Sequence, residues 1–538
     1  MADVQPLSPT RLRRLSKPWT GLQWGALAAA VLAITPLVAV IALAVFGGEA
    51  RASAPELIAR YALNSAVLAA LVALGAGSAG ALAAWLIVMH RFPGRSFFAW
   101  ALALPLAAPA FLLAYAYADL FDAAGPIRTA FRDAFGSELP LNMRSLPGAA
   151  FVLSAAFYPY VYLTARTAFV NQSVAALEAA RTLGCSLRQA FFRVALPLAR
   201  PALAAGMALA VMETLADYGA VNFLSVQTLT TGVVRAWSVF GSTVAAARLS
   251  LLLMGAAAVL LMIERANRKG AGHDSGAARW RALPSLQLKG ASAWGASLFC
   301  LTLLTLGLLL PAGWLAWRGL SAVPEAPRLL LAAAHSLSLS VAGAAVTVVL
   351  AAVIAFGARG HPLAPRLASL GYATPGAVMA IGLLAPAGWL WRGFEGAVSG
   401  FGAGVGLLLY AYAARLMASA LEPIDAGLAR ITPSMGRAAR TLGETETGAV
   451  RRVHLPIAKG ALLTAALLVF VDVLKELPAT LILRPFNFDT LAVLADNYAA
   501  DERLAQAAWP ALLILLVAIG PVIVLTRRVA HSRPGAPS

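Results

Sequence analysis

The chain has 538 residues, of which 60% are hydrophobic and only 12% are charged. This composition excludes an ordinary soluble domain, in which charged residues make up about a quarter of the chain. The formal net charge is +18, but the basic residues gather beside apolar runs, so the charge indicates membrane topology and requires no nucleic-acid partner.

Long apolar runs recur throughout the chain at the length that crosses a membrane. We predict twelve spans, at 22–46, 61–89, 97–118, 148–165, 201–221, 243–263, 292–315, 332–356, 367–391, 405–421, 460–483 and 507–526. The first is too long for the apolar part of a signal peptide, so we expect an uncleaved anchor. The pattern predicts an all-α integral membrane protein.

Lysine and arginine are concentrated in the loops and tails that lie on one side of the membrane if the N-terminus is cytoplasmic. Loops rich in lysine and arginine remain on the cytoplasmic side of the membrane. We therefore expect a multi-pass protein of the bacterial inner membrane with both termini in the cytoplasm. The only cysteines, Cys185 and Cys300, fall in a loop and in a span, so no structural disulfide is expected between them.

One polar stretch occurs twice, as EAARTLGCSLRQAFFRVALPLARPAL at 178–203 and RAARTLGETETGAVRRVHLPIAKGAL at 437–462, at a constant offset of 259 residues. Further pairs extend the repeat: His90 with His361, Pro105 with Pro375, and Tyr160 and Tyr162 with Tyr410 and Tyr412. We predict two six-span halves, 1–264 and 291–538, joined by a cytoplasmic linker at 265–290. An even number of spans in each half makes this a parallel repeat.

The repeated stretch predicts a helix–turn–helix lying flat on the cytoplasmic surface. Gly184 should end a first short helix, and Ser186 and Gln189 have capping-box spacing for a second. Pro197 and Pro201 fall where the next span begins, a position that tolerates proline. An ordinary basic loop attracted to anionic lipid is the alternative, but lipid attraction does not require the sequence to recur.

The spacing of the stretch resembles the EAA loop of ATP-binding-cassette (ABC) importer permeases. The first copy, within 178–197, has Glu178, Ala179, Ala180, Gly184, Leu196 and Pro197. The second, within 437–456, keeps Ala438, Ala439, Gly443, Leu455 and Pro456 but has Arg437 in place of the glutamate. The resemblance implies that each loop docks on an ATPase subunit and transmits its closure.

Over nearly its whole length the chain resembles the fused twelve-span permeases of ferric-iron importers, most clearly at 470–492, 213–219 and 228–232. The resemblance implies the type I importer permease fold, two ATPase subunits, an extracytoplasmic solute-binding protein and transport of ferric iron by alternating access. It implies no enzyme activity and no bound cofactor, since the partner subunits bind ATP. None of the five lysines follows a glycine, which excludes a phosphate-binding loop here.

The two spans that follow the loops carry acidic pairs at equal spacing. Glu213 and Asp217 recur as Asp472 and Glu476, with Lys475 beside them. Charges within a membrane are costly unless they are paired or face water. They either pair with Lys475 or Arg484, or line a path for a cation; we expect no stably bound metal.

Other functions remain open at this stage. Permeases for thiamine, phosphonate, sulfate or polyamines share the loop, although the carboxylates disfavour an anionic substrate. An ion-gradient transporter or channel would leave the loops unexplained. A membrane enzyme is weaker still, because the loops hold no nucleophile–base or metal-ligand constellation. His90 and His361 lie at span ends, where we interpret them as interfacial residues.

Overall fold

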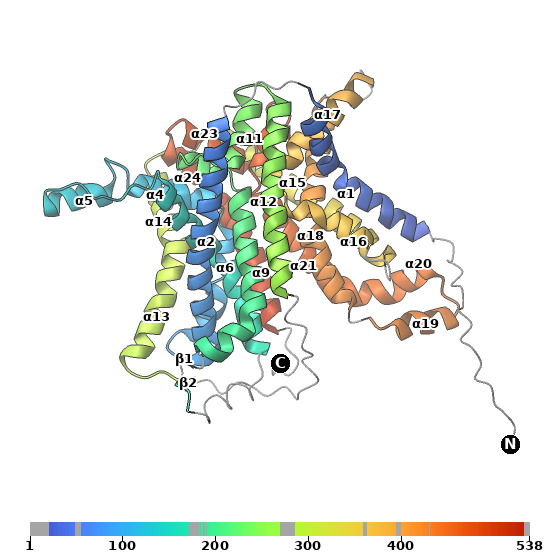
Figure 1. Cartoon of the computed structure of the whole chain (residues 1–538), viewed down its shortest axis with the longest axis horizontal. Coiled ribbons are helices and arrows are strands. Elements are labelled where there is room, and N and C mark those ends of the chain that lie inside the picture. The colour runs from blue at the N-terminus through green and yellow to red at the C-terminus, as the bar shows by residue number, and fades with distance from the viewer. Residues whose placement is uncertain are drawn as a thin grey trace.

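The computed structural model describes residues 21–48, 55–171, 191–268, 286–358, 363–393, 400–429 and 431–531, together with 182, 184–186 and 189. Within these ranges, ten helices are long and apolar enough to cross a membrane, and two bent helix pairs bring the number to twelve. Figure 1 shows the long helices side by side. The predicted all-α membrane fold is confirmed.

The helices and strands follow one another in a similar order in the two halves. The first half contains α1 (Gly21–Phe46), α2 (Pro55–Met89), β1 (His90–Arg91), α3 (Arg95–Ala101), η1 (Leu104–Ala107), α4 (Ala110–Leu120), α5 (Pro126–Phe135), α6 (Leu146–Asn171), η2 (Phe191–Ala195), α9 (Leu196–Ala216), α10 (Gly219–Phe223), α11 (Leu229–Ser238) and α12 (Thr243–Arg268). The second contains β2 (Leu286–Gln287), α13 (Ala291–Leu304), η3 (Thr305–Leu309), α14 (Leu310–Gly319), α15 (Ala326–Gly357), α16 (Leu363–Ala368), η4 (Ser369–Ala373), α17 (Gly376–Gly393), α18 (Gly400–Leu428), α19 (Pro433–Thr441), α20 (Glu446–Ala449), η5 (Val450–His454), α21 (Leu455–Leu474), α22 (Pro478–Leu483), α23 (Leu491–Ala500) and α24 (Leu504–His531).

The third and ninth predicted spans are broken rather than straight. The chain turns by 90° between η1 and α4, and by 101° between η4 and α17. Each break has an extended residue followed by a proline at the helix N-cap, Ala108–Pro109 in one and Thr374–Pro375 in the other. A residue before proline is disfavoured in the helical region, which explains the break. The predicted pairing of Pro105 with Pro375 was wrong by four positions, because Pro109 occupies the equivalent site.

The two halves are interlocked. One hydrophobic core joins α2, α3, α4 and α6 with α13, α14, α23 and α24, and the other joins α1, α11 and α12 with α15 to α18 and α22. Figure 1 shows the blue α1 beside α16 and α18, and α13 beside α2. The helices α9 and α21 contribute to both cores. Each half therefore completes its core with helices of the other.

The contact of α1 with the second half depends on a proline within α1. Pro36 lacks an N–H, so the Leu32 carbonyl loses its helical partner. The Tyr410 hydroxyl from α18 donates to that oxygen at 2.6 Å. On the other side, a Cβ at Gly382 of α17 would lie 2.1 Å from the Pro36 carbonyl oxygen. Only glycine permits α17 to approach α1 this closely.

A short parallel strand pair joins the end of α2 to the stretch before α13, with His90 opposite Leu286 and Arg91 opposite Gln287. Residues 286–287 were predicted to belong to the linker at 265–290; they are instead ordered against β1. Most of that linker, 269–285, lies outside the described residues.

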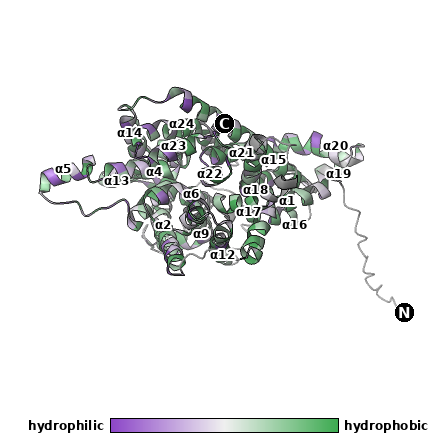
Figure 2. Cartoon of the chain, turned by 90° about the horizontal axis from the view of Figure 1, so that it is seen from above, coloured by the Kyte–Doolittle hydropathy of each residue, from purple (hydrophilic) through white to green (hydrophobic). Residues whose placement is uncertain are grey.

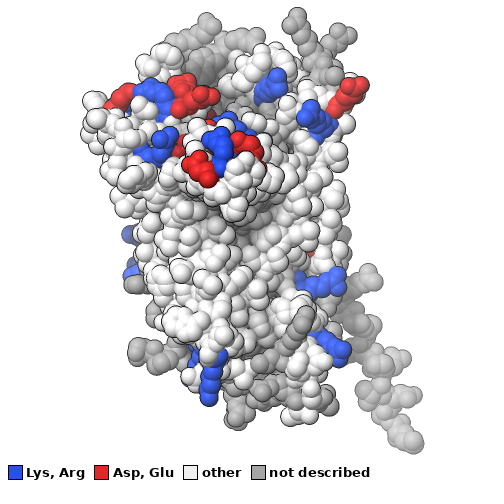
Figure 3. All heavy atoms as spheres, turned by 90° about the vertical axis from the view of Figure 1, so that its left-hand side faces the viewer, with Lys and Arg blue, Asp and Glu red and all other residues white. Residues whose placement is uncertain are grey.

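Polar residues project from the apolar body at two places. Seen from above, α5 extends from one end of the long axis and the α19–α20 segment from the other (Figure 2). The space-filling view shows an uncharged band across the middle of the molecule (Figure 3). Acidic and basic side chains mix above this band, and blue Lys and Arg side chains lie below it. The band is the surface expected to face lipid.

Candidate functional site

The second repeated loop folds as a helix, a turn and a helix. The helix α19 ends at Thr441 and is followed by Gly443, whose φ of +88° is in the left-handed region that favours glycine. The Glu444 N–H donates to the Ala439 carbonyl at 3.1 Å, the bond typical of a glycine-ended helix. The next helix, α20, is capped by Thr445, whose Oγ1 accepts from the Gly448 N–H at 3.0 Å.

In the first loop, Glu178, Ala179 and Ala180 lie outside the described residues. Gly184 has a φ of +84°, matching Gly443. The predicted capping box is confirmed, since the Ser186 N–H donates to Gln189 Oε1 at 2.9 Å and the Gln189 N–H donates to Ser186 Oγ at 3.3 Å. The described residues of the two loops therefore share the glycine turn and the capping bond that follows it.

Both loops run directly into a membrane span. The Leu-Pro pairs stand at the first turn of α9 and α21, and a π-helical turn, η2 or η5, precedes each. Leu196 and Leu455 are the first residues of these helices. In the second loop, α20, η5 and α21 follow one another without a break, so the loop helix leads directly into the span. A force applied to α20 acts on α21 directly.

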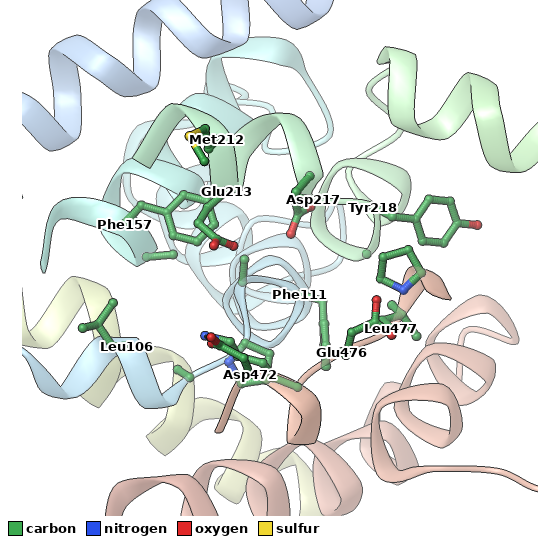
Figure 4. Close-up of a pocket in the computed structure, with 18 of the residues that line it drawn as sticks. Leu106, Phe111, Phe157, Met212, Glu213, Asp217, Tyr218, Asp472, Glu476 and Leu477 are labelled. Atoms are coloured by element: carbon green, nitrogen blue, oxygen red, sulfur yellow. The ribbon is translucent and has the colours of Figure 1, made fainter. Parts of the chain in front are cut away.

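A cavity of about 90 Å³ lies where α9 and α21 meet α6, α18 and the break between η1 and α4. It has room for several water molecules. All four predicted carboxylates line it, together with Tyr160, Arg415 and Lys475. Figure 4 shows Glu213 and Asp217 on one side of this space and Asp472 and Glu476 on the other. The acidic pair of the first half and the acidic pair of the second half therefore line the same cavity.

Two of the carboxylates cap short helices at equivalent places. Asp217 Oδ1 accepts from the backbone N–H groups of Ala220 and Val221, at 3.0 and 3.1 Å. Glu476 accepts from Ala479 N at 2.9 Å and from Thr480 N at 3.0 Å. A carboxylate at a helix start satisfies N–H groups that otherwise lack partners. These bonds begin α10 and α22, just after the long helices end.

The cations of the cavity are both held by carboxylates. Lys475 Nζ lies 3.0 Å from Asp472 Oδ1, one of the two pairings that the sequence left open. Arg484 pairs instead with Asp489, so the alternative partner was wrong. Arg415 Nη1 lies 3.2 Å from Glu476 Oε1, whose side chain is fully buried. Arg415 was not predicted as a site residue, although it falls within the span predicted at 405–421.

Glu213 differs from the other three carboxylates. Among the described residues, no hydrogen bond or ion pair to its side chain is found, although its carboxylate faces a cavity that contains Lys475 and Arg415. It lies on α9 at the position where Asp472 lies on α21. Glu213 is therefore the carboxylate most available to a molecule entering the cavity.

Within the described parts of the chain, no group of three or more His, Cys, Asp or Glu side chains could hold a metal ion. His90 is buried at the end of α2, with its ring 6.1 Å from that of Trp85. Burial lowers its pKa below the usual value, so the imidazole is neutral at pH 7 and packs as part of the structure. His361 lies outside the described residues.

Residues 76–263 match the family described as "Binding-protein-dependent transport system inner membrane component". The molybdenum transport system permease protein ModB of Escherichia coli is 30% identical over 203 residues, which cover 87% of that protein and 36% of this chain. The chain belongs to this permease family. The repeated loops and paired spans are thus those of a transport permease.

The permease is also similar along most of its length to the Fe(3+)-transport system permease protein FbpB 2 of Haemophilus influenzae. The two are 24% identical over 86% of this chain and 89% of that protein. The sulfate transport system permease protein CysT of Salmonella typhimurium is 32% identical over 32% of this chain and 60% of its own length. The permease is a membrane subunit of a binding-protein-dependent ABC importer and not an enzyme. Membership implies ATPase and solute-binding partners and an inner-membrane location.

Proposed function

We propose that the permease carries ferric iron inward through the cavity between α9 and α21. The observation that supports this most directly is the free carboxylate of Glu213 in a cavity lined by three further carboxylates. Oxygen ligands suit hard cations such as ferric iron. A transporter needs a site that attracts its substrate but releases it, and one unpaired carboxylate among paired ones fits that need.

The charges of the cavity favour a cation over an oxyanion. The similarity to sulfate and molybdenum permeases makes an oxyanion the competing substrate, and Arg415 and Lys475 are the residues that would bind it. Each of them already contacts a carboxylate, Glu476 or Asp472. An oxyanion would have to displace these partners, whereas a cation finds Glu213 available.

The two EAA loops are the proposed sites for two ATPase subunits. Each loop continues through a π-helical turn into α9 or α21, which flank the cavity. Closure of the ATPases would therefore move the cavity walls, which is alternating access. The proposal places both termini and the linker 265–290 in the cytoplasm, with a solute-binding protein on the outer face between the halves 1–264 and 291–538. Two parallel six-span repeats provide two equivalent docking sites.

Reconstitution of the permease with its ATPase and solute-binding protein in vesicles tests the proposal. We expect ATP-dependent uptake of iron, without uptake of sulfate, molybdate, phosphonate or thiamine, when the proton gradient is collapsed. Glu213→Gln should abolish most of the iron uptake, and Glu56→Gln, which changes an exposed carboxylate of α2, should not. Uptake of an oxyanion in place of iron would overturn the assignment, and uptake without ATP would indicate a gradient-driven transporter.

A further inference from the structure

The helix α5 (Pro126–Phe135) has an apolar face of which, within the described residues, only Ile127 at its start packs against the core. Ile127, Ala130, Phe131, Ala134 and Phe135 recur at the spacing of one helical face. No residue of α5 is buried, and Phe135 is 71% exposed. The Phe131 and Phe135 rings lie 4.7 Å apart and so form one continuous apolar surface. The second half has no equivalent helix between α17 and α18 in the described residues.

The position of α5 is set by contacts at the end of α4. Asp119 accepts from Trp314 Nε1 at 2.8 Å and pairs with Arg318 Nε at 2.8 Å, in the last turns of α14. The neighbouring Trp317 is 67% exposed. An exposed tryptophan beside an ion pair at the end of a span is typical of the membrane–water interface. Because α5 begins a few residues after α4 ends, it starts at this level.

From that level α5 projects sideways, away from the helix bundle (Figures 1 and 2). Figure 3 faces the side from which it projects, and the uncharged band begins beneath the level of the mixed charges. The lipid-facing surface of α13 and η3 below it is apolar, with Leu298 at 63% and Leu309 at 49% exposure. A helix that leaves the bundle here must extend over the lipid that surrounds these spans.

We propose that α5 is an interfacial anchor that lies in the surface of the membrane leaflet opposite the EAA loops, with its Phe131–Phe135 face in lipid. Amphipathic helices of this kind bury their apolar side at the boundary between headgroups and acyl chains. Arg128 and Arg132 flank that face, where their stems cover apolar surface. Their charged ends are held by the loop that follows α5, since Arg128 donates to the Leu141 carbonyl and Arg132 Nη1 lies 3.2 Å from Glu138 Oε1. The uncharged band of the bundle begins directly beneath the level at which α5 leaves it, which favours lipid over a protein partner. The anchor fixes the α4 end and the η1–α4 break that borders the cavity.

A fluorescent probe on each face of α5 tests this in the full-length permease. Cys185 and Cys300 are replaced by serine and alanine, and an environment-sensitive dye is attached to Phe135→Cys or, as the matched control, to Asp133→Cys on the polar face. The variants are reconstituted into phosphatidylcholine–phosphatidylglycerol vesicles, with and without bromines on the upper part of the acyl chains. We expect several-fold stronger bromine quenching at position 135 than at position 133, and stronger quenching by aqueous iodide at position 133.

Equal access of iodide to both positions in a correctly inserted protein would overturn the proposal. Shielding of position 135 that appears only after addition of the solute-binding protein would make the face a docking site for that protein instead. Shielding that rises with the protein-to-lipid ratio would indicate contact between copies of the permease. Because Asp133 and Phe135 are exposed, both variants should keep the elution volume and melting temperature of the parent protein that lacks Cys185 and Cys300.

Discussion

Glu476 and Glu213 line the same cavity, yet removing the charge of one should affect stability and removing the charge of the other should affect transport. Glu476→Gln removes the negative charge and one of the two oxygens that accept from Ala479 N, Thr480 N and Arg415, at 2.9, 3.0 and 3.2 Å. Glu213→Gln changes a side chain for which no such bond is found within the described residues. We expect the first substitution to destabilise the permease and the second to impair transport alone.

The contacts of Glu476 set the magnitude of the first effect. Removing one partner of a buried ion pair costs about 3–5 kcal/mol, because the other charge stays buried and unpaired. The Glu476 side chain is fully buried and that of Arg415 is 17% exposed, so water partly compensates and the lower end of that range applies. Loss of the helix cap, about 1 kcal/mol, is part of the same change. For Glu213→Gln we expect the free energy of unfolding to fall by less than about 0.5 kcal/mol, as for sites without such contacts.

Thermal unfolding of the purified permease in detergent, followed by intrinsic fluorescence, ranks the variants, and iron uptake in vesicles is measured in parallel. Glu476→Gln should lower the melting temperature clearly, and adding Arg415→Met should recover part of the loss because the unpaired cation is gone. Glu213→Gln should melt like the unmodified protein and transport little iron. The reasoning is refuted if both single variants melt alike, or if Glu213→Gln transports at the normal rate.

Three further outcomes are expected. Gly184→Val and Gly443→Val should each reduce ATP hydrolysis stimulated by the solute-binding protein, because valine in the left-handed region costs about 1–2 kcal/mol. The effect of Gly184→Val should be stronger, because only the first loop keeps its glutamate, Glu178; normal stimulation in both would contradict this. Asp472→Asn should lower the melting temperature, and adding Lys475→Met should restore it, since the two side chains pair at 3.0 Å. If the double variant melts as low as Asp472→Asn alone, the pairing is excluded as the cause of the lowered melting temperature. A reporter active only in the cytoplasm should work within the linker 265–290 and fail in the loop after α5, and activity at the second site would overturn the orientation.

Local sequence determined much of this protein. An apolar run of about 20 residues matches the thickness of a membrane, and a helix satisfies all its backbone groups within the segment, so the spans were predictable from the sequence. The recurrence of Gly184 as Gly443 and of Ser186 as Thr445 showed where the turns and caps lie, since a positive φ and a helix start have strong residue preferences. The spacing of Glu213 and Asp217, repeated in the second half, indicated that the four carboxylates form one set.

What each carboxylate contacts was decided only by the tertiary structure. Spacing places Asp217 and Glu476 at equivalent positions but cannot show that α9 and α21 end there and leave N–H groups for them to cap. Arg415 reaches Glu476 from 61 residues earlier in the chain, and Asp119 meets α14 of the other half. The packing of α1 against the second half and of α14 against the first was likewise decided by the tertiary structure. Hydrophobic burial is non-directional, so a periodic apolar helix fits many neighbours, and only close packing of the whole bundle selects among them.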